Sequence, residues 1–294
     1  MKPRFAATSW SEDETPKIAE PAPFPPGLAR AEGALDIRFR RRGDLTVLDH
    51  LYQQGCAKAR FPKREAGAFS TAVTLNTSGG LTDGDRIATS IEWGAGTAAT
   101  VASQAAERAY RAMGPVPARL STRLTVGAGA RAEWLPQETI LFDGAALQRD
   151  LEVAVAGDAV FTGLEQVVFG RTARGEVVRG GQFRDAWRIR RDGRLLYADV
   201  FALSGDMQET LAARATGQGM VATASIVHVA PGAGDRLGEV RNALGHFALW
   251  GASADDDMLI IRLLAETGAH LRPMVLAALA PLRDGRPVPR VWQI

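Results

Sequence analysis

The sequence has little of the chemistry that usually binds metals or cross-links small folds: it has one cysteine and four histidines in 294 residues. The single cysteine, Cys56, cannot form a disulfide within the chain or supply a multi-cysteine metal site, and we expect a small buried side chain. The histidines lie far apart, and none has the paired spacing of a zinc hydrolase, so we expect each to be structural or exposed. They are His50, His228, His246 and His270.

Long apolar runs and catalytic signatures are also missing. No segment approaches the roughly 18 consecutive apolar residues of a membrane span, and the N-terminus lacks the basic start and apolar stretch of a secretory signal. We therefore expect a cytoplasmic protein without a membrane segment. The sequence contains no Gly-x-Ser-x-Gly elbow and no phosphate-loop signature, so nucleophilic catalysis has no support.

Charge is nearly balanced, which argues against nucleic acid as a partner. The formal net charge is only +2, too small for a general phosphate-binding surface, and we expect protein partners instead. The densest basic run is typical of a solvated strand end rather than of a phosphate site. It consists of Arg38, Arg40, Arg41 and Arg42.

Two regions differ in composition. Residues 1–27 have no periodic apolar pattern and are rich in proline, which favours extended, solvated backbone, so we predict a flexible tail. The chain as a whole is 46% hydrophobic and 23% charged, as in a globular protein. We predict a single domain over residues 28–294, with a β-rich body up to about residue 200 and an α/β lobe over residues 201–294.

Strand patterns dominate the predicted body. Short runs of alternating apolar residues at 71–75, 123–126 and 151–155 end in turns that contain glycine. The clearest hairpin joins residues 187–191 to residues 194–200 through Asp192-Gly193. This pair favours a tight hairpin because it readily adopts the positive φ angles of a type I′ turn.

A weak internal repeat runs through the same region. Residues 93–104 align with residues 126–137 at an offset of 33 positions, and a looser third copy covers residues 157–166. Each copy reads as strand, glycine turn and strand, so stacked copies would pair neighbouring backbones as in a β-solenoid. The predicted fold class is therefore mainly β: a stacked, β-helix-like or solenoid-like body with a few helices, the clearest near the C-terminus.

The glycine turns of this repeat, at residues 94–99 and 127–132, match the loose glycine pattern of dinucleotide-binding proteins. We interpret the match as accidental. Such a site needs a helix whose N-terminal amides face the pyrophosphate, whereas the second copy continues into Glu133-Trp-Leu-Pro136, a poor start for a helix. Because the two turns are copies of one repeat, the argument applies to both.

The C-terminal region carries the helical pattern. An apolar face at helical spacing predicts a helix that ends near Asp284-Gly285, and a shorter helix is predicted over residues 235–244 with Asp235 as its N-cap. Residues 258–264 read as a buried strand. Trp250, Trp292 and the C-terminal helix are candidate anchors for protein partners. The apolar face consists of Leu271, Met274, Val275, Ala278, Leu279 and Leu282.

Several acidic residues lie beside glycines or inside apolar strands. Each carboxylate could accept hydrogen bonds from turn amides or pair with an arginine, which is common for Asp and Glu in turns. Alternatively, several face a wet interior passage, because an unpaired carboxylate is costly in a dry core, and there they would meet a cation. The set consists of Asp83, Asp85, Glu165, Glu176 and Asp199.

A series of short motifs between about residue 33 and residue 292 resembles the UreD family of urease accessory proteins, also called UreH. A single motif of this kind is weak, but the order and spacing of the motifs together are specific. The motif positions are Gly79, Gly80, Gly84 and Asp85, then Tyr110 and Arg111, then Trp134 and Pro136 within residues 133–138, then Ile140 and Phe142, then Gly170, Arg171, Gly175 and Glu176, and finally residues 289–292.

The resemblance implies a non-enzymatic scaffold for urease maturation. Proteins of this family are described as stacks of β-strands that bind the urease apoprotein and UreF, which recruits the GTPase UreG. Nickel is expected to pass transiently through an internal tunnel, with no tightly bound cofactor. Matched by motif, Asp85 and Glu176 line this route, and Glu165 and Asp199 are further tunnel positions. Asp83 stands where relatives usually have a glycine.

Two other interpretations stay open at this point. A β-solenoid hydrolase or transferase would use Asp85, Glu165 and Glu176 as acid and base. A plain assembly scaffold would only change the shape of urease and would tolerate loss of each acidic residue. The scarcity of cysteine and clustered histidine fits a conduit, since such ligands would trap nickel in transit, and it fits equally a protein that never contacts metal.

Overall fold

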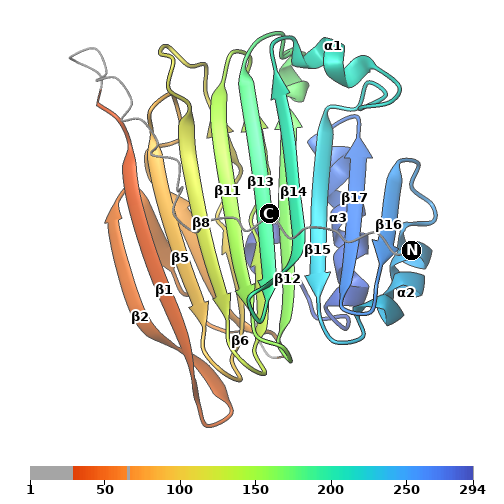
Figure 1. The fold of residues 1–294 in the computed structure, drawn as a ribbon. Helices are drawn as coiled ribbons and strands as arrows, with labels where there is room; N and C mark the ends of the chain where they lie inside the picture. The colour runs from red at the N-terminus through yellow and green to blue at the C-terminus, as the bar shows by residue number, and fades with distance from the viewer. Residues whose placement is uncertain (1–28, 65–66, 294) are drawn as a thin grey trace, which may run out of the picture.

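The structure, a computed structural model, describes residues 29–64 and 67–293, so the predicted tail at residues 1–27 lies outside the described residues. Two β-sheets pack face to face, and helices cover the outer face of one of them (Figure 1). No helix in the described part of the chain is long and apolar enough to cross a membrane.

The first sheet has seven strands in the order β14-β13-β11-β8-β5-β1-β2. The five central strands run parallel to their neighbours, and the edge strands β2 and β14 are antiparallel. The strands are β1 (Glu32–Arg42), β2 (Leu45–Gly55), β5 (Arg86–Trp93), β8 (Ala118–Val126), β11 (Ala146–Val155), β13 (Gln182–Arg191) and β14 (Arg194–Ser204).

The second sheet has ten strands, eight of them in the order β16-β17-β15-β12-β9-β6-β4-β3, while β10 pairs with β12 and β7. Strands β4, β6, β9 and β12 are parallel, and β15, β17 and β16 continue the sheet in antiparallel fashion. The strands are β3 (Ala57–Arg60), β4 (Ser70–Asn76), β6 (Ala98–Ser103), β7 (Glu107–Ala109), β9 (Arg131–Leu135), β10 (Thr139–Leu141), β12 (Val160–Phe169), β15 (Ala222–Val229), β16 (Trp250–Ala254) and β17 (Met258–Ala265).

The chain builds these sheets by passing repeatedly from one to the other, and the predicted repeat is the unit of this winding. Trp93 at the end of β5 pairs in register with Val126 at the end of β8, and Val126 pairs with Val155 of β11. Gly96 and Gly129 make the intervening turns at φ 64° and 63°. Each turn leads into a strand and not into a helix. The prediction that these glycine turns are not a dinucleotide site is consistent with this. The predicted solenoid-like β body is confirmed.

The predicted hairpin is also present. Strands β13 and β14 pair from Arg191↔Arg194 outward, with Asp192 at φ 49° and Gly193 at φ 79°. Both central residues have the positive φ angles that favour a type I′ turn.

The helices are α1 (Met207–Ala212), α2 (Leu237–Leu244) and α3 (Gly268–Leu282), with short 3-10 helices η1 (Thr172–Arg174), η2 (Ala233–Arg236) and η3 (Arg290–Trp292). All six residues of the predicted apolar face are buried in α3. The predicted cap of α2 is wrong. Asp235 lies inside η2, which continues directly into the helix, and the amide of Leu237 already bonds to Gly234. The N-cap is Arg236, and its side chain makes no capping hydrogen bond.

Three apolar clusters fill the molecule. One lies between the two sheets and includes Trp93 and Phe161. A second, which includes Leu81 and Phe183, fills another part of the body. The third joins β15 and β17 to α2 and α3 and contains Trp292, which is only 2% exposed. Trp292 therefore belongs to the core and is not a surface anchor.

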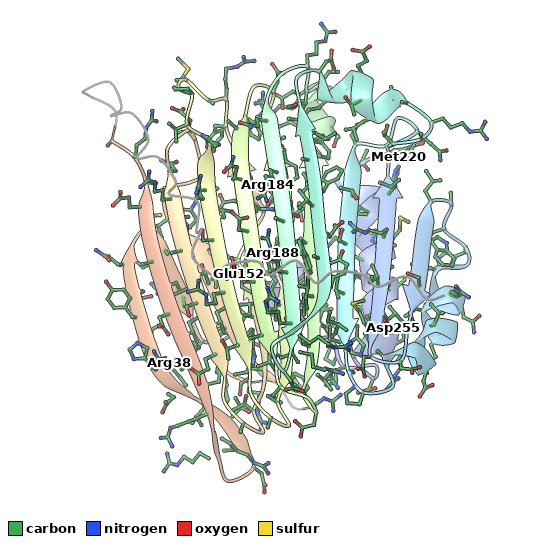
Figure 2. All side chains as sticks on the ribbon, in the orientation of Figure 1. Arg38, Glu152, Arg184, Arg188, Met220 and Asp255 are labelled. Carbon is green, nitrogen blue, oxygen red and sulfur yellow. The ribbon has the colours of Figure 1, made fainter. Side chains whose placement is uncertain are left out.

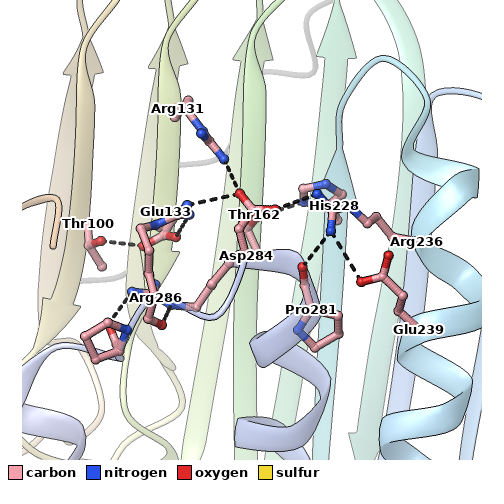
Figure 3. Close-up of polar contacts among 12 residues, drawn as sticks. Thr100, Arg131, Glu133, Thr162, His228, Arg236, Glu239, Pro281, Asp284 and Arg286 are labelled. Atoms are coloured by element: carbon pink, nitrogen blue, oxygen red, sulfur yellow. Dashed lines mark hydrogen bonds and ion pairs between the residues drawn. The ribbon is translucent and has the colours of Figure 1, made fainter. Parts of the chain in front are cut away.

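Ion pairs fasten the C-terminal end of α3 to the ten-stranded sheet (Figure 3). Glu133 of β9 accepts a hydrogen bond from Arg283. Asp284 pairs with Arg131 of β9 at 2.7 Å and with Arg236 of η2 at 2.5 Å. The hydrogen bond from Arg131, together with neighbouring arginines, lowers the pKa of Asp284 to about 2. Helix α3 is thus fixed to the ten-stranded sheet by ion pairs as well as by apolar packing.

The outer face of the seven-stranded sheet has no helix against it in the described ranges, and polar side chains cover it (Figure 2). The predicted solvated basic strand end is confirmed at the end of β1, where Arg40 and Arg41 are 54% and 55% exposed. His228 is buried, whereas His50, His246 and His270 are exposed, and Cys56 is half-buried rather than fully buried.

Candidate functional site

Three charged side chains interrupt the apolar inner faces of two adjacent strands of the seven-stranded sheet and of one strand of the ten-stranded sheet that faces them. Arg149 of β11, Glu165 of β12 and Asp185 of β13 each occupy an inward position, because alternate residues of a strand point to the same face. Their neighbours on that face are apolar: Leu147 and Leu151 on β11, Val167 on β12, and Phe183 and Trp187 on β13. The result is a thin polar layer between apolar clusters.

Arg149 holds the layer together. Its Nη1 donates to Glu165 Oε2 at 2.7 Å and to Thr139 Oγ1 at 3.0 Å, and its Nη2 donates to Asp185 Oδ2 at 2.7 Å. The indole Nε1 of Trp134 donates to the other oxygen of Glu165 at 3.0 Å. One guanidinium therefore balances two carboxylates, which leaves the cluster with a formal charge of about −1.

Two atoms of this cluster have no hydrogen-bond partner among the described residues. They are Nε of Arg149 and Oδ1 of Asp185, although Asp185 is only 8% exposed. Burial raises the pKa of Glu165, and the charge of Arg149 opposes that effect. Burial thus disfavours the ionised form of Glu165, and the charge of Arg149 favours it.

A cavity of about 280 Å³ adjoins the cluster between the two sheets. It reaches from Arg149, Glu165 and Asp185 to Glu107 of β7. Strands of both sheets supply further wall residues. The motif residues Trp134, Pro136 and Gly79 are also part of the cavity wall. The remaining polar side chains of the wall include Thr74, Asn76, Thr89, Ser103, Gln104, Thr122, Gln137 and Thr139.

Glu107 is a further carboxylate on this wall. Asn76 donates to both of its oxygens, at 3.2 and 3.1 Å. Burial raises the pKa of Glu107, and the nearby charge of Asp85 raises it further. The cavity is therefore bounded by carboxylates on its β7 side as well as on its β12 side.

On the other side of Arg149, the polar layer continues to the edge of the sandwich. Glu165 is in register with Ser225 of β15, and Ser225 with Arg262 of β17. Arg262 donates to Asp199 Oδ2 at 2.6 Å and to the hydroxyl of Tyr197 at 2.9 Å. Burial raises the pKa of Tyr197 to about 12. Asp199, predicted as a tunnel position, thus lies at the edge strand β14 in an ion pair.

Asp83 and Asp85 lie in a turn and are bound by local partners. Asp85 accepts hydrogen bonds from the amides of Ala31 and Thr82, both at 2.7 Å. Asp83 accepts from the Met113 amide at 2.8 Å and from Arg30 at 2.7 Å. Burial opposes ionisation of Asp83, but these hydrogen bonds and the arginine lower its pKa overall. Asp83 therefore fastens this turn to two other segments of the chain.

Glu176 also has a local partner. Arg171 donates to it from the backbone amide at 2.9 Å, from Nε at 3.0 Å and from Nη2 at 2.8 Å, and these bonds lower the pKa of Glu176. Gly170 has φ 84°, and a Cβ there would lie 2.6 Å from the carbonyl oxygen of Glu176. Gly175 follows η1 at φ 66°. The Gly170-Arg171 and Gly175-Glu176 motifs therefore form one closed loop.

The other glycine motif packs against its neighbouring loop. Tyr110 donates its hydroxyl to the carbonyl of Gly79 at 2.9 Å, and a Cβ on Gly80 would lie 2.4 Å from the Tyr110 ring. Arg111 pairs with Asp143 of the next loop. Most of the motif residues thus act in stacked loops of the solenoid.

The structure therefore divides the four predicted transit carboxylates. Glu165 lines the cavity and Asp199 lies in the adjoining polar layer, whereas Asp85 and Glu176 are not among the residues of the cavity wall. No group of three or more His, Cys, Asp or Glu side chains over residues 29–64 and 67–293 is arranged to hold a metal ion. Arg149, Asp185 and Glu107 were not predicted. Arg149 and Asp185 could have been found, because each is a charged residue at an inward position of the alternating pattern of β11 or β13. Strand β7 is too short for its pattern to indicate Glu107.

These features define a two-sheet β-solenoid protein with a polar interior layer. The sequence profile of the UreD urease accessory protein family matches residues 31–293. The "Urease accessory protein UreD" of Rhizobium etli is 45% identical over 265 residues, covering 90% of this chain and 96% of the relative. The proteins of the same name in Chelativorans sp. and Methylobacterium sp. are 42% and 44% identical, covering 94% of this chain and 97% and 99% of the relatives. The chain belongs to the UreD urease accessory protein family, and this membership supports a role in urease maturation.

Proposed function

We propose that the protein is a non-enzymatic maturation factor that binds apo-urease, bridges it to UreF and the GTPase UreG, and passes nickel toward the urease active site. The observation that carries the nickel route is the polar layer: a cavity of about 280 Å³ whose wall includes Glu107, Glu165 and Asp185 inside an otherwise apolar sandwich. Nickel is cargo in this proposal, and no cofactor is bound tightly.

The chemistry of the layer suits passage better than storage. Nickel binds nitrogen and sulfur ligands strongly, so histidine or cysteine clusters would retain it, whereas separate carboxylates, hydroxyls and water hold it weakly. A route must bind an ion well enough to admit it and weakly enough to release it. The excess negative charge around Arg149 favours a cation over an anion.

The four predicted carboxylates take different places in this proposal. Glu165 and Asp199 act in the interior layer. Asp85 is close enough to Glu107 for its charge to raise the pKa of that residue, and we place Asp85 and Glu176 at the loop end of the route. Their local hydrogen bonds would have to yield to an arriving ion.

A deletion of the gene from a urease operon, complemented with variants, tests the proposal. Wild-type protein restores the nickel content and activity of urease, while Glu165→Gln restores neither yet still co-purifies urease and UreF. Glu152→Gln, at an exposed position on the outer face of β11 and outside the cavity wall, is the matched control and restores both. Full nickel loading of urease in the deletion strain would refute a maturation role, and full loading with Glu165→Gln would refute the interior route.

A plain assembly scaffold is the second candidate, because Asp85 and Glu176 are already bound by turn amides and by Arg171. In that case Asp85→Asn and Glu176→Gln would disturb the loops and the co-purification of partners together. The hydrolase interpretation has no such support. The structure does not gather Asp85, Glu165 and Glu176 around one cavity.

A further inference from the structure

The guanidinium of Arg149 lies inside the polar layer, between the two sheets. It reaches from the seven-stranded sheet to Glu165 on the ten-stranded sheet and contacts Asp185 and Thr139 as well. The cavity lies on one side of it, and the Asp199–Arg262 pair lies toward the other edge of the sandwich. The guanidinium therefore lies between the cavity and the Asp199–Arg262 pair.

We propose that Arg149 is a displaceable plug that fills a divalent-cation site formed by Glu165 and Asp185. The identity of the cation as nickel rests on the function proposed above, but the site itself would accept any divalent metal that binds oxygen ligands. In the closed state the guanidinium supplies the positive charge. In the open state a divalent cation takes its place between the two carboxylates.

The oxygens around the guanidinium are suitably arranged for this exchange. Glu165 Oε2, Asp185 Oδ2 and Thr139 Oγ1 all lie within 3.0 Å of its terminal nitrogens, so all three face the same small space. Two buried carboxylates without a counterion would be costly, so the space is stable only with a cation in it. Carboxylate and hydroxyl oxygens bind divalent cations without the strong retention of thiolates or imidazoles.

Two unpaired atoms provide a path for the exchange. Oδ1 of Asp185 is buried and has no partner in the described chain, so it can act as the first ligand while Arg149 is still in place. Nε of Arg149 is likewise unpaired among the described residues, so the guanidinium is hydrogen-bonded through its terminal nitrogens, and it packs on Phe183. The adjoining cavity of about 280 Å³ gives the displaced guanidinium room to move.

Metal titration of the purified full-length chain, without a histidine tag, tests the plug directly. NiCl₂ is the probe, and MnCl₂ is the comparison that favours oxygen ligands. Removing one competing positive charge at this distance is expected to tighten Ni²⁺ binding by about tenfold or more in Arg149→Gln. Arg149→Lys keeps the charge and stays close to wild type. Arg149→Gln combined with Glu165→Gln loses the gain.

Thermal unfolding with and without NiCl₂ gives a second readout. The metal raises the melting temperature of Arg149→Gln more than that of the wild type, because only the variant has an empty pair of carboxylates. If Arg149→Gln folds only when Ni²⁺ or Mn²⁺ is present, the plug is supported. If it remains unfolded with either metal, or folds without any gain in affinity, the plug is refuted. A gain that persists in the double variant also refutes it.

These results are separable from the proposed function. Tighter Ni²⁺ binding by Arg149→Gln, together with normal urease loading by Glu165→Gln, would establish the site and refute the route. If Glu165→Gln fails to load urease and Arg149→Gln does not bind Ni²⁺ more tightly, the proposed nickel route is supported and the proposed role of Arg149 as a plug is refuted.

Discussion

Arg149 shows at the scale of one residue why a buried ion cluster is a sign of function more than of stability. Desolvating three charges costs free energy that their mutual attraction barely recovers, so apolar residues of the same volume would stabilise such a site at least as well. Removing only the positive member is different, because it leaves Glu165 and Asp185 buried side by side without a counterion.

We therefore expect Arg149→Gln, in the absence of metal, to lower the free energy of unfolding by about 3–5 kcal/mol. Arg184→Gln is the control. Arg184 pairs with Asp150 at 2.8 Å on the outer face of the neighbouring strand, where both side chains are about one-third exposed, and its loss should cost less than about 1 kcal/mol. Urea denaturation of the two variants checks the difference. Equal costs would mean that the interior pair of carboxylates is already solvated.

His228 is a second buried titratable residue, on the opposite face of the ten-stranded sheet. It shares a hydrogen bond of 2.9 Å with Thr162. Burial, followed by the charge of Arg236, lowers its pKa from 6.5 to about 4. The folded protein therefore keeps this imidazole neutral at pH values where the unfolded chain has already bound a proton.

The sign of the pH dependence follows. Above pH 6.5 His228 is neutral in the folded and the unfolded protein, and it causes no loss of stability. Between about pH 6.5 and pH 4 the unfolded protein binds the proton first, so the free energy of unfolding falls by up to about 3 kcal/mol as the pH is lowered. His228→Gln should flatten this part of the curve, measured as the free energy of unfolding from pH 7 to pH 4. His50→Gln, at an exposed position of β2, is the control variant. A curve of unchanged slope in His228→Gln would contradict the assignment.

At the scale of elements, the loop glycines differ in what they require. Gly80 has φ 148°, and a Cβ there would meet the Tyr110 ring at 2.4 Å and the Arg108 carbonyl oxygen at 2.8 Å. Gly79 has φ 83°, and its Cβ would meet nothing within 4 Å. The first glycine is needed for both conformation and space, and the second for conformation alone.

Gly80→Ala should therefore destabilise the protein by about 2–4 kcal/mol, since strain and overpacking add, while Gly79→Ala costs about 1–2 kcal/mol. Thermal denaturation of the two variants measures the gap. If Gly79→Ala is the more harmful change, the stacking of Tyr110 on the glycine loop is not what holds this end of the solenoid.

Local patterns predicted elements well, and the site less well. The Asp192-Gly193 turn and the apolar face of α3 each depend on a short stretch of sequence, so both could be predicted from the sequence alone. The predicted N-cap at Asp235 was wrong because the 3-10 helix η2 precedes α2 without a break. The local residue pattern does not distinguish such a start from a capped one. Arg149 and Asp185 break an apolar alternation and could have been found from it. Their pairing with Glu165 could not, because it depends on which strands the winding places together.

At the scale of the whole molecule, the polar layer separates apolar clusters that would otherwise merge into one core. The layer spans the sandwich from Glu107 on β7 to Asp199 on the edge strand β14, with Arg149 between them. In a two-sheet body, such a layer lies between two backbones that are each hydrogen-bonded within their own sheet.

If this layer carries nickel, blocking its cavity should stop loading without disturbing assembly. Thr122 lies on the cavity wall and on the inner face of β8, and its neighbour Ser121 is exposed on the outer face of the same strand. Thr122→Phe fills part of the passage, and a barrier of even about 1.4 kcal/mol slows transfer about tenfold. The nickel content of urease matured with Thr122→Phe should fall accordingly, while Ser121→Phe leaves it unchanged and both variants co-purify urease. Normal loading with a folded Thr122→Phe protein would mean that nickel reaches urease along another path, and the interior of this scaffold would then have only a structural role.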